Sequence, residues 1–100
     1  MKVVFSRLAR RDLVRLRAFI GSRNPDAARG AALRIKQATQ TLVEHPYIGR
    51  SVVPPDNGPI DDIREIPIAF GASGYLLRYR IREEEVHILR IWQAREDRDD

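Results

Sequence analysis

The chain has 100 residues, of which 43% are hydrophobic and 32% charged, and its 18 lysines and arginines against 14 acids leave a net charge of +4. This length predicts one domain over residues 1–100, and the absence of cysteine excludes a disulfide framework, a thiolate metal site and a cysteine nucleophile. The apolar run before the first arginines is too short for a signal peptide, and no apolar segment approaches the ~18 residues of a membrane helix. We therefore expect a cytoplasmic protein without membrane contacts, whose positive charge suits an acidic protein or a polyanion.

The N-terminal part is typical of a strand followed by a helix. Residues 3–5 are β-branched or aromatic, and Ser6 after them is a good N-cap. In the helix that follows, apolar side chains recur at three- and four-residue spacing and the arginines mostly fall elsewhere, until Gly21 ends it. The expected buried stripe is Ala9, Leu13, Leu16 and Ile20. This helix is therefore amphipathic, with a basic outer side.

A second helix is predicted to start directly afterwards. Asn24, Pro25 and Asp26 supply an N-capping amide, a proline at the first helical position and an acid near the positive end of the dipole. The expected buried stripe is Ala28, Ala31, Ile35, Ala38 and Leu42. Because Pro46 pushes the residue before it out of the α region, this helix must finish near His45. So short a connection between the two helices predicts an antiparallel helical hairpin.

The stretch HPYIGR at residues 45–50 joins the helical half to a proline-rich segment. From Gly49 to Asp62 the chain has three prolines, two glycines and an asparagine, so we expect a loop and no regular element. Gly49 turns the chain. Arg50 is left to bond the carbonyls at the end of the second helix, to pair with a nearby acid, or to contact a partner protein.

The second half of the chain switches to the two-residue period of strands. Three strands are expected, over residues 63–68, 75–80 and 87–92. The connections at residues 71–74 and 82–85 are short enough that both pairs should be antiparallel hairpins. Pro67 indicates that the first of these strands lies at a sheet edge or ends there.

The alternation within these strands assigns side chains to two faces of a sheet. The face toward the helices should carry Tyr75, Leu77, Tyr79, Leu89 and Ile91. The other face should be open and basic, with Arg64, Arg78, Arg80, Arg90 and Trp92. The expected fold class is α+β in the order β-α-α-β-β-β, with the N-terminal strand and an antiparallel helical hairpin packed on one face of a mainly antiparallel sheet. The basic face is either ordinary solvated surface or a binding surface.

No residue pattern indicates catalysis or a metal site. His87 is interpreted as a satisfied, partly buried strand histidine, and His45 as a group that caps the helix dipole. Neither histidine has a second ligand at a recognisable spacing. The glycine-containing connection at residues 71–74 precedes a strand, whereas a phosphate-binding loop precedes a helix. We expect no catalytic residue, no metal and no cofactor.

Five stretches, taken in order, resemble the RelE/ParE toxin superfamily of bacterial toxin–antitoxin systems. They are the Asp-Leu pair in the first helix, the NPDAA helix start, L-x-x-HP-x-x-GR at residues 42–50, GYLLRYRI at 74–81 and VHILRIW at 86–92. The resemblance covers nearly the whole chain. It implies a toxin that is produced with an antitoxin, which wraps and neutralises it, so a toxin–antitoxin hetero-oligomer is expected.

The resemblance also implies a choice between two targets. One branch of the superfamily cuts messenger RNA in the ribosome, and the ParE-like branch poisons DNA gyrase. RNA cleavage needs a general base, a general acid and a cation beside the phosphorane. The positions that match these groups in RNA-cutting relatives hold Tyr75, Leu76 and the Gln-Ala-Arg of residues 93–95, which are poor acids and bases near neutral pH. The ParE-like branch is therefore favoured, with gyrase inhibited by binding.

The residues inferred to bind the target are Arg64, Arg78, Arg80, Arg90, Trp92, Arg95 and Arg98. Arg50 is a further contact for the antitoxin or the target, and residues 94–100 are expected to form a frayed tail. Two alternatives stay open. One is a RelE-like ribosome-dependent endoribonuclease whose arginines contact phosphate, and the other is a non-catalytic module that binds nucleic acid directly, which a gyrase inhibitor is not expected to do. Gln93 stands where similar chains commonly carry histidine. A toxin with weakened or lost activity is therefore a further alternative.

Overall fold

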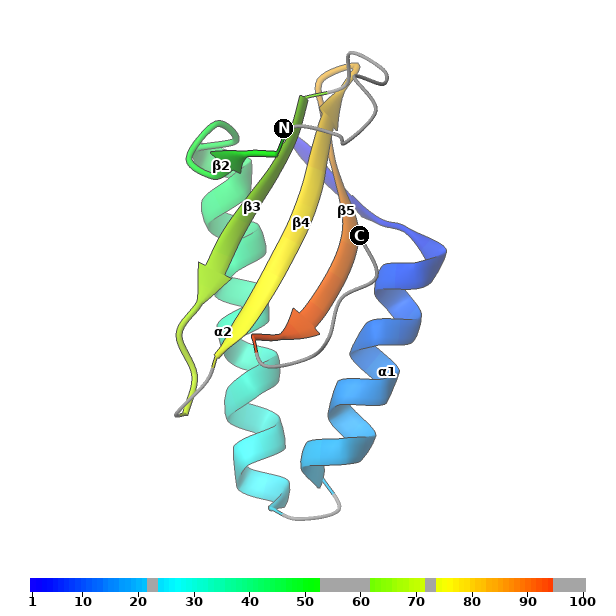
Figure 1. Cartoon of the computed structure of the whole chain (residues 1–100), viewed down its shortest axis with the longest axis vertical. Helices are drawn as coiled ribbons and strands as arrows, with labels where there is room; N and C mark the ends of the chain where they lie inside the picture. The colour runs from blue at the N-terminus through cyan, green and yellow to red at the C-terminus, as the bar shows by residue number, and fades with distance from the viewer. Residues whose placement is uncertain (22–23, 53–61, 72–73, 95–100) are drawn as a thin grey trace.

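The computed structural model describes residues 1–21, 24–52, 62–71 and 74–94, which form two helices and a five-stranded sheet (Figure 1). The elements in chain order are β1 (Lys2–Phe5), α1 (Arg7–Gly21), α2 (Pro25–Glu44), β2 (Arg50–Ser51), β3 (Asp62–Ile68), β4 (Tyr75–Arg82) and β5 (Glu85–Gln93). The predicted α+β order is confirmed, with β2 as an addition. None of the helices in the described ranges is long and apolar enough to cross a membrane.

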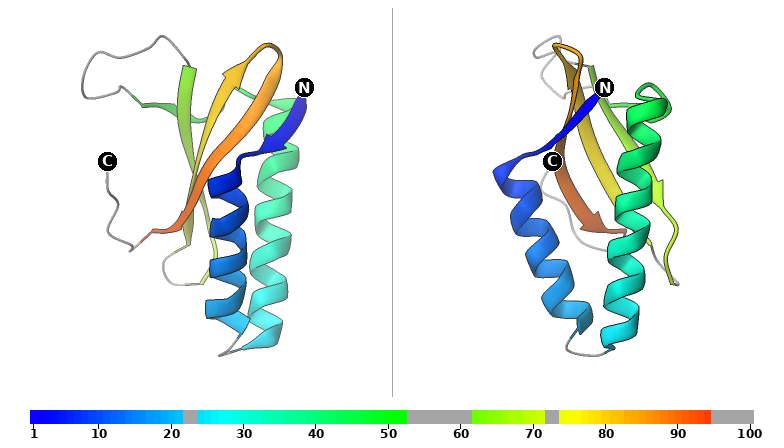
Figure 2. Two further views of the ribbon diagram at one scale, coloured as in Figure 1. Left: turned by 90° about the vertical axis from the view of Figure 1, so that its right-hand side faces the viewer. Right: turned by 180° about the vertical axis from the view of Figure 1, so that it is seen from behind.

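The sheet has the strand order β1-β5-β4-β3-β2, in which β1 is parallel to β5 and the other neighbours are antiparallel. Both helices lie on one side of it, as the side view in Figure 2 shows. The core between the two layers is built from α1 and α2 against β4 and β5, and its fully buried members include Leu42, Leu77, Tyr79, Ile88 and Ile91. The mainly antiparallel sheet with helices on one face is therefore confirmed.

Both helices begin where their caps predict. The Ser6 hydroxyl oxygen accepts a hydrogen bond of 3.0 Å from the Ala9 amide, and the Asn24 side-chain oxygen accepts from the Asp26 and Ala27 amides at 3.1 Å. Each cap satisfies amides that have no partner inside the helix. The stripes are confirmed at Ala9, Leu16 and Ile20 and at Ala31, Ile35 and Leu42, which are buried.

The turn after α2 is held from the sheet by a buried tyrosine. The Tyr79 hydroxyl donates to the Pro46 carbonyl at 2.7 Å and accepts from the Gly49 amide at 2.9 Å. A Cβ atom at Gly49 would lie 2.5 Å from this hydroxyl oxygen, so only glycine fits there. The HPYIG stretch is thus a structural connection between α2 and the sheet.

The segment predicted as a loop without regular structure starts with a short strand. Arg50 and Ser51 form β2 and pair with Glu65 and Arg64 of β3. The prediction was wrong for these two residues because backbone pairing with a neighbouring strand, rather than strand propensity, makes them regular. Val52 follows β2, and its amide donates to the Ile63 carbonyl at 2.8 Å. Residues 53–61 of the predicted loop lie outside the described residues. β2 pairs with β3 only at Arg64 and Glu65, so Pro67 lies on a part of β3 that forms the edge of the sheet, as predicted.

The prediction of which β5 residues face the helices was partly wrong because of a β-bulge. Arg78 pairs with Arg90 and Tyr79 pairs with Ile88, so Leu89 has no partner in β4. One extra residue in a strand moves the side chains before it to the other face. Ile88, together with Val86, is therefore buried against the helices in place of Leu89, which is partly exposed.

Candidate functional site

Four charged side chains lie in one row across the open face of the sheet. The register places Arg50 of β2 opposite Glu65 of β3, Glu65 opposite Arg78 of β4, and Arg78 opposite Arg90 of β5. Residues directly opposite one another in antiparallel strands point to the same face. The predicted open-face positions of Arg78 and Arg90 are thus confirmed, and a glutamate lies in the row with them.

Glu65 is the buried acid of this row. Its side chain is 3% exposed, and its Oε2 atom lies 2.7 Å from Arg78 Nη2 and accepts from Arg78 Nε at 2.8 Å. Arg50 approaches Oε1 at 3.6 Å from the neighbouring strand, with a side chain that is 81% exposed. A two-atom contact of this kind holds the guanidinium plane in one orientation. Arg78 is therefore held by the sheet itself.

Asp12 does for Arg90 what Glu65 does for Arg78. This α1 residue is 4% exposed, and it accepts hydrogen bonds from Arg90 Nε at 2.8 Å, from Arg90 Nη2 at 3.1 Å and from the Ile91 amide at 2.8 Å. β1 pairs with β5 only as far as Ile88, so beyond that point the outer edge of β5 has no neighbouring strand in the part of the chain that the structure describes. Asp12 satisfies one of the free amides of that edge and joins α1 to the sheet.

The pKa of Asp12 reflects this setting. Burial disfavours the charged form and on its own raises the pKa, but the hydrogen bonds from Arg90 and the Ile91 amide and the charge of Arg90 together outweigh it. The pKa of Asp12 therefore lies below its ordinary value of 3.8. At neutral pH the group is a buried carboxylate that holds Arg90 in place.

Trp92 completes the cluster. The guanidinium carbons of Arg78 and Arg90 lie 5.0 and 5.1 Å from the centroid of its indole ring, within the range of cation–π contact. The indole is only 5% exposed. We call Asp12, Glu65, Arg78, Arg90 and Trp92 the open-face cluster. Its aromatic and its two arginines lie on the predicted face, but they are engaged with one another and with buried acids.

The predicted position of Arg64 on the open face is wrong. Arg64 pairs with Tyr79 across the β3–β4 ladder, and Tyr79 points to the helices, so Arg64 does too. Its Nη1 atom donates to the carbonyls of Tyr47 and Gly49 at 3.0 and 2.9 Å, and its Nε atom donates to Asp62 at 2.9 Å. Strand alternation places Arg64 with Ile66 and Ile68, and the carbonyls of the turn satisfy its charge there.

The remaining predicted site residues lie outside the open-face cluster. Arg80 is partly buried on the open face, opposite His87 in β5. Arg50 pairs with an adjacent acid, one of the alternatives left open for it. Arg95 and Arg98, with the predicted frayed tail, lie outside the described residues apart from Ala94, whose amide donates to the Gly74 carbonyl at 3.1 Å.

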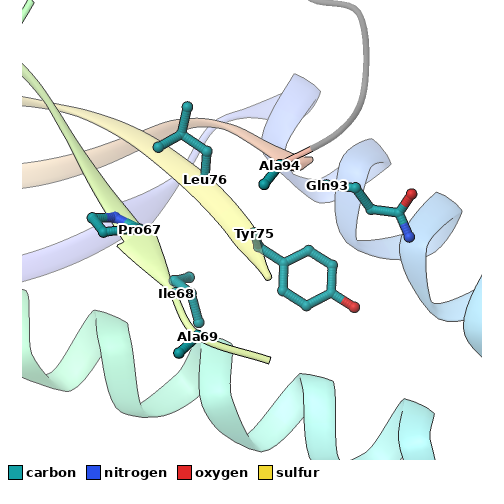
Figure 3. Close-up of a pocket in the computed structure, with 7 residues that line it drawn as sticks. All are labelled: Pro67, Ile68, Ala69, Tyr75, Leu76, Gln93 and Ala94. Atoms are coloured by element: carbon teal, nitrogen blue, oxygen red, sulfur yellow. The ribbon is translucent and has the colours of Figure 1, made fainter. Parts of the chain in front are cut away.

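A hollow of about 290 Å³ lies at the edge of the sheet where β3 and β5 end and β4 begins (Figure 3). Its lining is Pro67, Ile68, Ala69, Tyr75, Leu76, Gln93 and Ala94. Tyr75 stacks on Phe70 with ring centroids 5.9 Å apart, and burial raises the pKa of its hydroxyl above the ordinary value of 10.0. The hollow contains Tyr75, Leu76 and Gln93, the strand positions that match the cleavage groups of RNA-cutting relatives. Their only polar side-chain groups are the phenol of Tyr75 and the carboxamide of Gln93.

The two histidines lie in β5 and just after α2, respectively. His87 is partly buried, as predicted, and its Nε2 atom lies 3.2 Å from a carboxylate oxygen of Glu85. At the end of α2 the backbone amide of His45 donates to the Thr41 carbonyl at 2.7 Å. Within the described ranges there is no group of three or more His, Asp or Glu side chains that could hold a metal ion.

Sequence reasoning missed the two buried acids. Asp12 falls three residues after Ala9 and four before Leu16, which is the spacing of the buried stripe, and a lone acid in such a stripe is a signal of a buried ion pair. Glu65 gives a weaker signal, because only knowledge of the strand register brings Arg78 opposite it. The apolar stripe of α1 thus contains one charged member.

Comparison with known proteins covers almost all of the chain. The family described as ParE toxin of type II toxin-antitoxin system, parDE, matches residues 3–98. Toxin RelE1 of Caulobacter vibrioides is 40% identical over 96% of both chains, and Toxin RelE3 of the same organism is 37% identical over 90% of both. A solved structure described as a chromosomal ParDE TA system from P. aeruginosa superposes with a TM-score of 0.69, covering 93% of this chain and 95% of that one, at 22% identity. That structure supports the fold.

Proposed function

Because the chain belongs to the ParE toxin family of type II toxin–antitoxin systems, we propose that it inhibits DNA gyrase by binding and that a cognate antitoxin neutralises it in a hetero-oligomer. The family is the premise of this proposal. The choice of gyrase rests on the chemistry of the hollow at the end of the sheet.

The observation that carries the proposal is the lining of that hollow. Of its described residues only Tyr75 can titrate, and burial raises the pKa of Tyr75 further from neutrality. A general acid–base pair works best when its pKa values lie near the operating pH. Gln93 can donate and accept hydrogen bonds but cannot transfer a proton. The hollow is therefore better suited to receiving a side chain of a protein than to cutting a phosphodiester.

The open face is our candidate for the target-binding surface. Arg50 projects from its β2 side with 81% of its side chain exposed, and Arg80, Arg95 and Arg98 remain proposed contacts of the same target. The open-face cluster contributes mainly by shaping this surface, because its two arginines are 22% and 35% exposed and bonded to buried acids. Arg64 lies on the other side of the sheet, where it supports the turn after α2 with a side chain that is 22% exposed, so we no longer assign it to the target-binding surface.

The rival function is a RelE-like endoribonuclease. It is favoured by the names of the curated relatives, each described as a RelE toxin. In that case the arginines would have to bind phosphate in the transition state. Arg78 and Arg90 already direct Nε and Nη2 at Glu65 and Asp12, which leaves fewer of their five N–H donors for a phosphate and offsets part of their positive charge.

The test separates the two targets in one preparation. Purified protein is added to gyrase in a supercoiling assay and, in parallel, to translating ribosomes with a labelled transcript. We expect loss of supercoiling without transcript cleavage, and about a tenfold higher inhibitory concentration for Arg50→Ala. Arg34→Ala, an exposed change on α2, is the matched control and should behave as the unchanged protein. Transcript cleavage with normal supercoiling would replace the proposal with the ribonuclease.

A further inference from the structure

The positive charge of the molecule is concentrated in α1. This helix contains five arginines and a single acid, Asp12, and so has a net charge of +4. The whole chain has the same net charge of +4, so the charges outside α1 cancel. A net charge equal to that of the whole chain is therefore concentrated in this one helix of 15 residues.

The arginines of α1 point to solvent. Arg7, Arg10 and Arg11 are exposed, and among the described residues no ion pair or hydrogen bond involves their side chains. Arg15 lies in the same group, with 46% of its side chain exposed and a contact of 3.4 Å to Asp12. This differs from the open-face cluster, in which each arginine has a buried carboxylate.

An apolar residue lies among these arginines. Val14 is 69% exposed, and together with Arg7, Arg10, Arg11 and Arg15 it lines a shallow hollow on the outside of the helix. The helical repeat of 3.6 residues puts positions 7, 11 and 14 on one outward face. Exposed apolar groups ringed by charge are typical of protein contact surfaces.

We propose that this surface, the outer α1 face, binds an acidic protein segment that places an apolar side chain against Val14. Arginine forks bind carboxylates in pairs of hydrogen bonds, and Val14 can be covered by an apolar neighbour but gains nothing from a phosphate. These two features favour a protein over a nucleic acid as the occupant. The proposal does not depend on whether gyrase is the target.

The test uses the full chain and a fluorescein-labelled amphipathic peptide whose glutamates flank leucines. Fluorescence anisotropy measures its affinity for the unchanged protein and for the double variant Arg7→Glu/Arg11→Glu, which should bind about tenfold more weakly. Val14→Gln, which alters no charge, should bind about threefold more weakly. The matched control is Arg34→Glu/Lys36→Glu, two exposed positions on α2 with the same change of charge, expected to differ less than about twofold. Far-UV circular dichroism verifies that each variant is folded.

Three outcomes would overturn the proposal. Absence of peptide binding by the unchanged protein removes it directly. An equal loss of affinity in the α1 and α2 double variants would mean that only overall charge attracts the peptide. If duplex DNA binds more tightly than the peptide, loses affinity in the α1 double variant and is indifferent to Val14→Gln, the outer α1 face is a nucleic-acid surface instead.

Discussion

The open face of the sheet and the outer face of α1 both carry several arginines, yet they differ in what surrounds them. Arg78 and Arg90 on the sheet are bonded to buried Glu65 and Asp12 and stack over Trp92. The arginines at the start of α1 are exposed and have no described partner of opposite charge. A count of arginines therefore does not distinguish the two faces. What distinguishes them is whether each guanidinium has an acid near it.

The largest expected effect comes from removing the aromatic part of the cluster. Trp92→Ala should lower the free energy of unfolding by about 3–5 kcal/mol, because it empties a site that is 5% exposed. Urea denaturation measures the loss. Val14→Ala on the outer α1 face, 69% exposed, should change stability by less than about 0.5 kcal/mol. Similar small effects for both substitutions would mean that Trp92 is a surface residue.

Asp12→Ala should be the next most harmful change. It leaves Arg90 and the Ile91 amide without their acceptor, and breaking such a buried pair costs about 3 kcal/mol. The matched control is Asp26→Ala, because Asp26 also pairs with an arginine three residues along a helix but is 85% exposed. The control should lose no more than about 1 kcal/mol. Equal losses would contradict the contrast between buried and exposed pairs.

The stabilising effect of Asp12 should depend on pH. Because its folded-state pKa is depressed below 3.8, the carboxylate stabilises the fold above about pH 4, and this contribution is lost as the pH falls through the folded-state pKa. The difference in unfolding free energy between the unchanged protein and Asp12→Asn should therefore be full at pH 6 and shrink below about pH 4. Denaturation curves at several pH values measure it. A gap that stays constant down to the acid limit would argue against an ionised Asp12.

The smallest expected effect has the opposite sign. Arg7 lies in the first turn of α1, near the positive end of the helix dipole and four residues from Arg11. Arg7→Glu should raise the free energy of unfolding by about 0.5 kcal/mol, because it removes a like-charge pair and favours the dipole. Lys36→Glu in the middle of α2 is the control and should have less effect. A loss of stability in Arg7→Glu would indicate that Arg7 has a structural partner.

The fold could be predicted from the sequence where the signals were local. The Ser6 and Asn24 caps, the stripes of α1 and α2 and the alternation in β4 each depend on neighbours a few residues away, and the structure agrees with them. The bulge at Leu89 and the pairing of β2 depend on the neighbouring strand. Local patterns contain no information on that pairing, so the face of Ile88 and the short β2 could not be foreseen.

The candidate site was predicted less well for the same reason. The open-face positions of Arg78, Arg90 and Trp92 followed from alternation. Their engagement with Glu65 and Asp12 joins residues far apart in the chain, and only the register and the packing of α1 against β5 reveal it. Arg64 was assigned to the wrong face even though it alternates in step with apolar Ile66. A charged residue in an apolar series is more often satisfied by nearby carbonyls than displaced to the other face.

The most direct test of the contrast between the two surfaces is the free energy of unfolding of two variants that lose the same charge, Arg90→Gln and Arg11→Gln. Arg90→Gln removes the pair with buried Asp12, in which the Arg90 side chain is 35% exposed, and the contact with Trp92, so we predict a loss of about 2 kcal/mol. The exposure of Arg11 predicts a change of less than about 0.5 kcal/mol, toward greater stability. If Arg11→Gln destabilises the protein as much as Arg90→Gln does, the arginines of α1 are structural, and the contrast between engaged arginines on the sheet and solvent-exposed arginines on α1 is wrong.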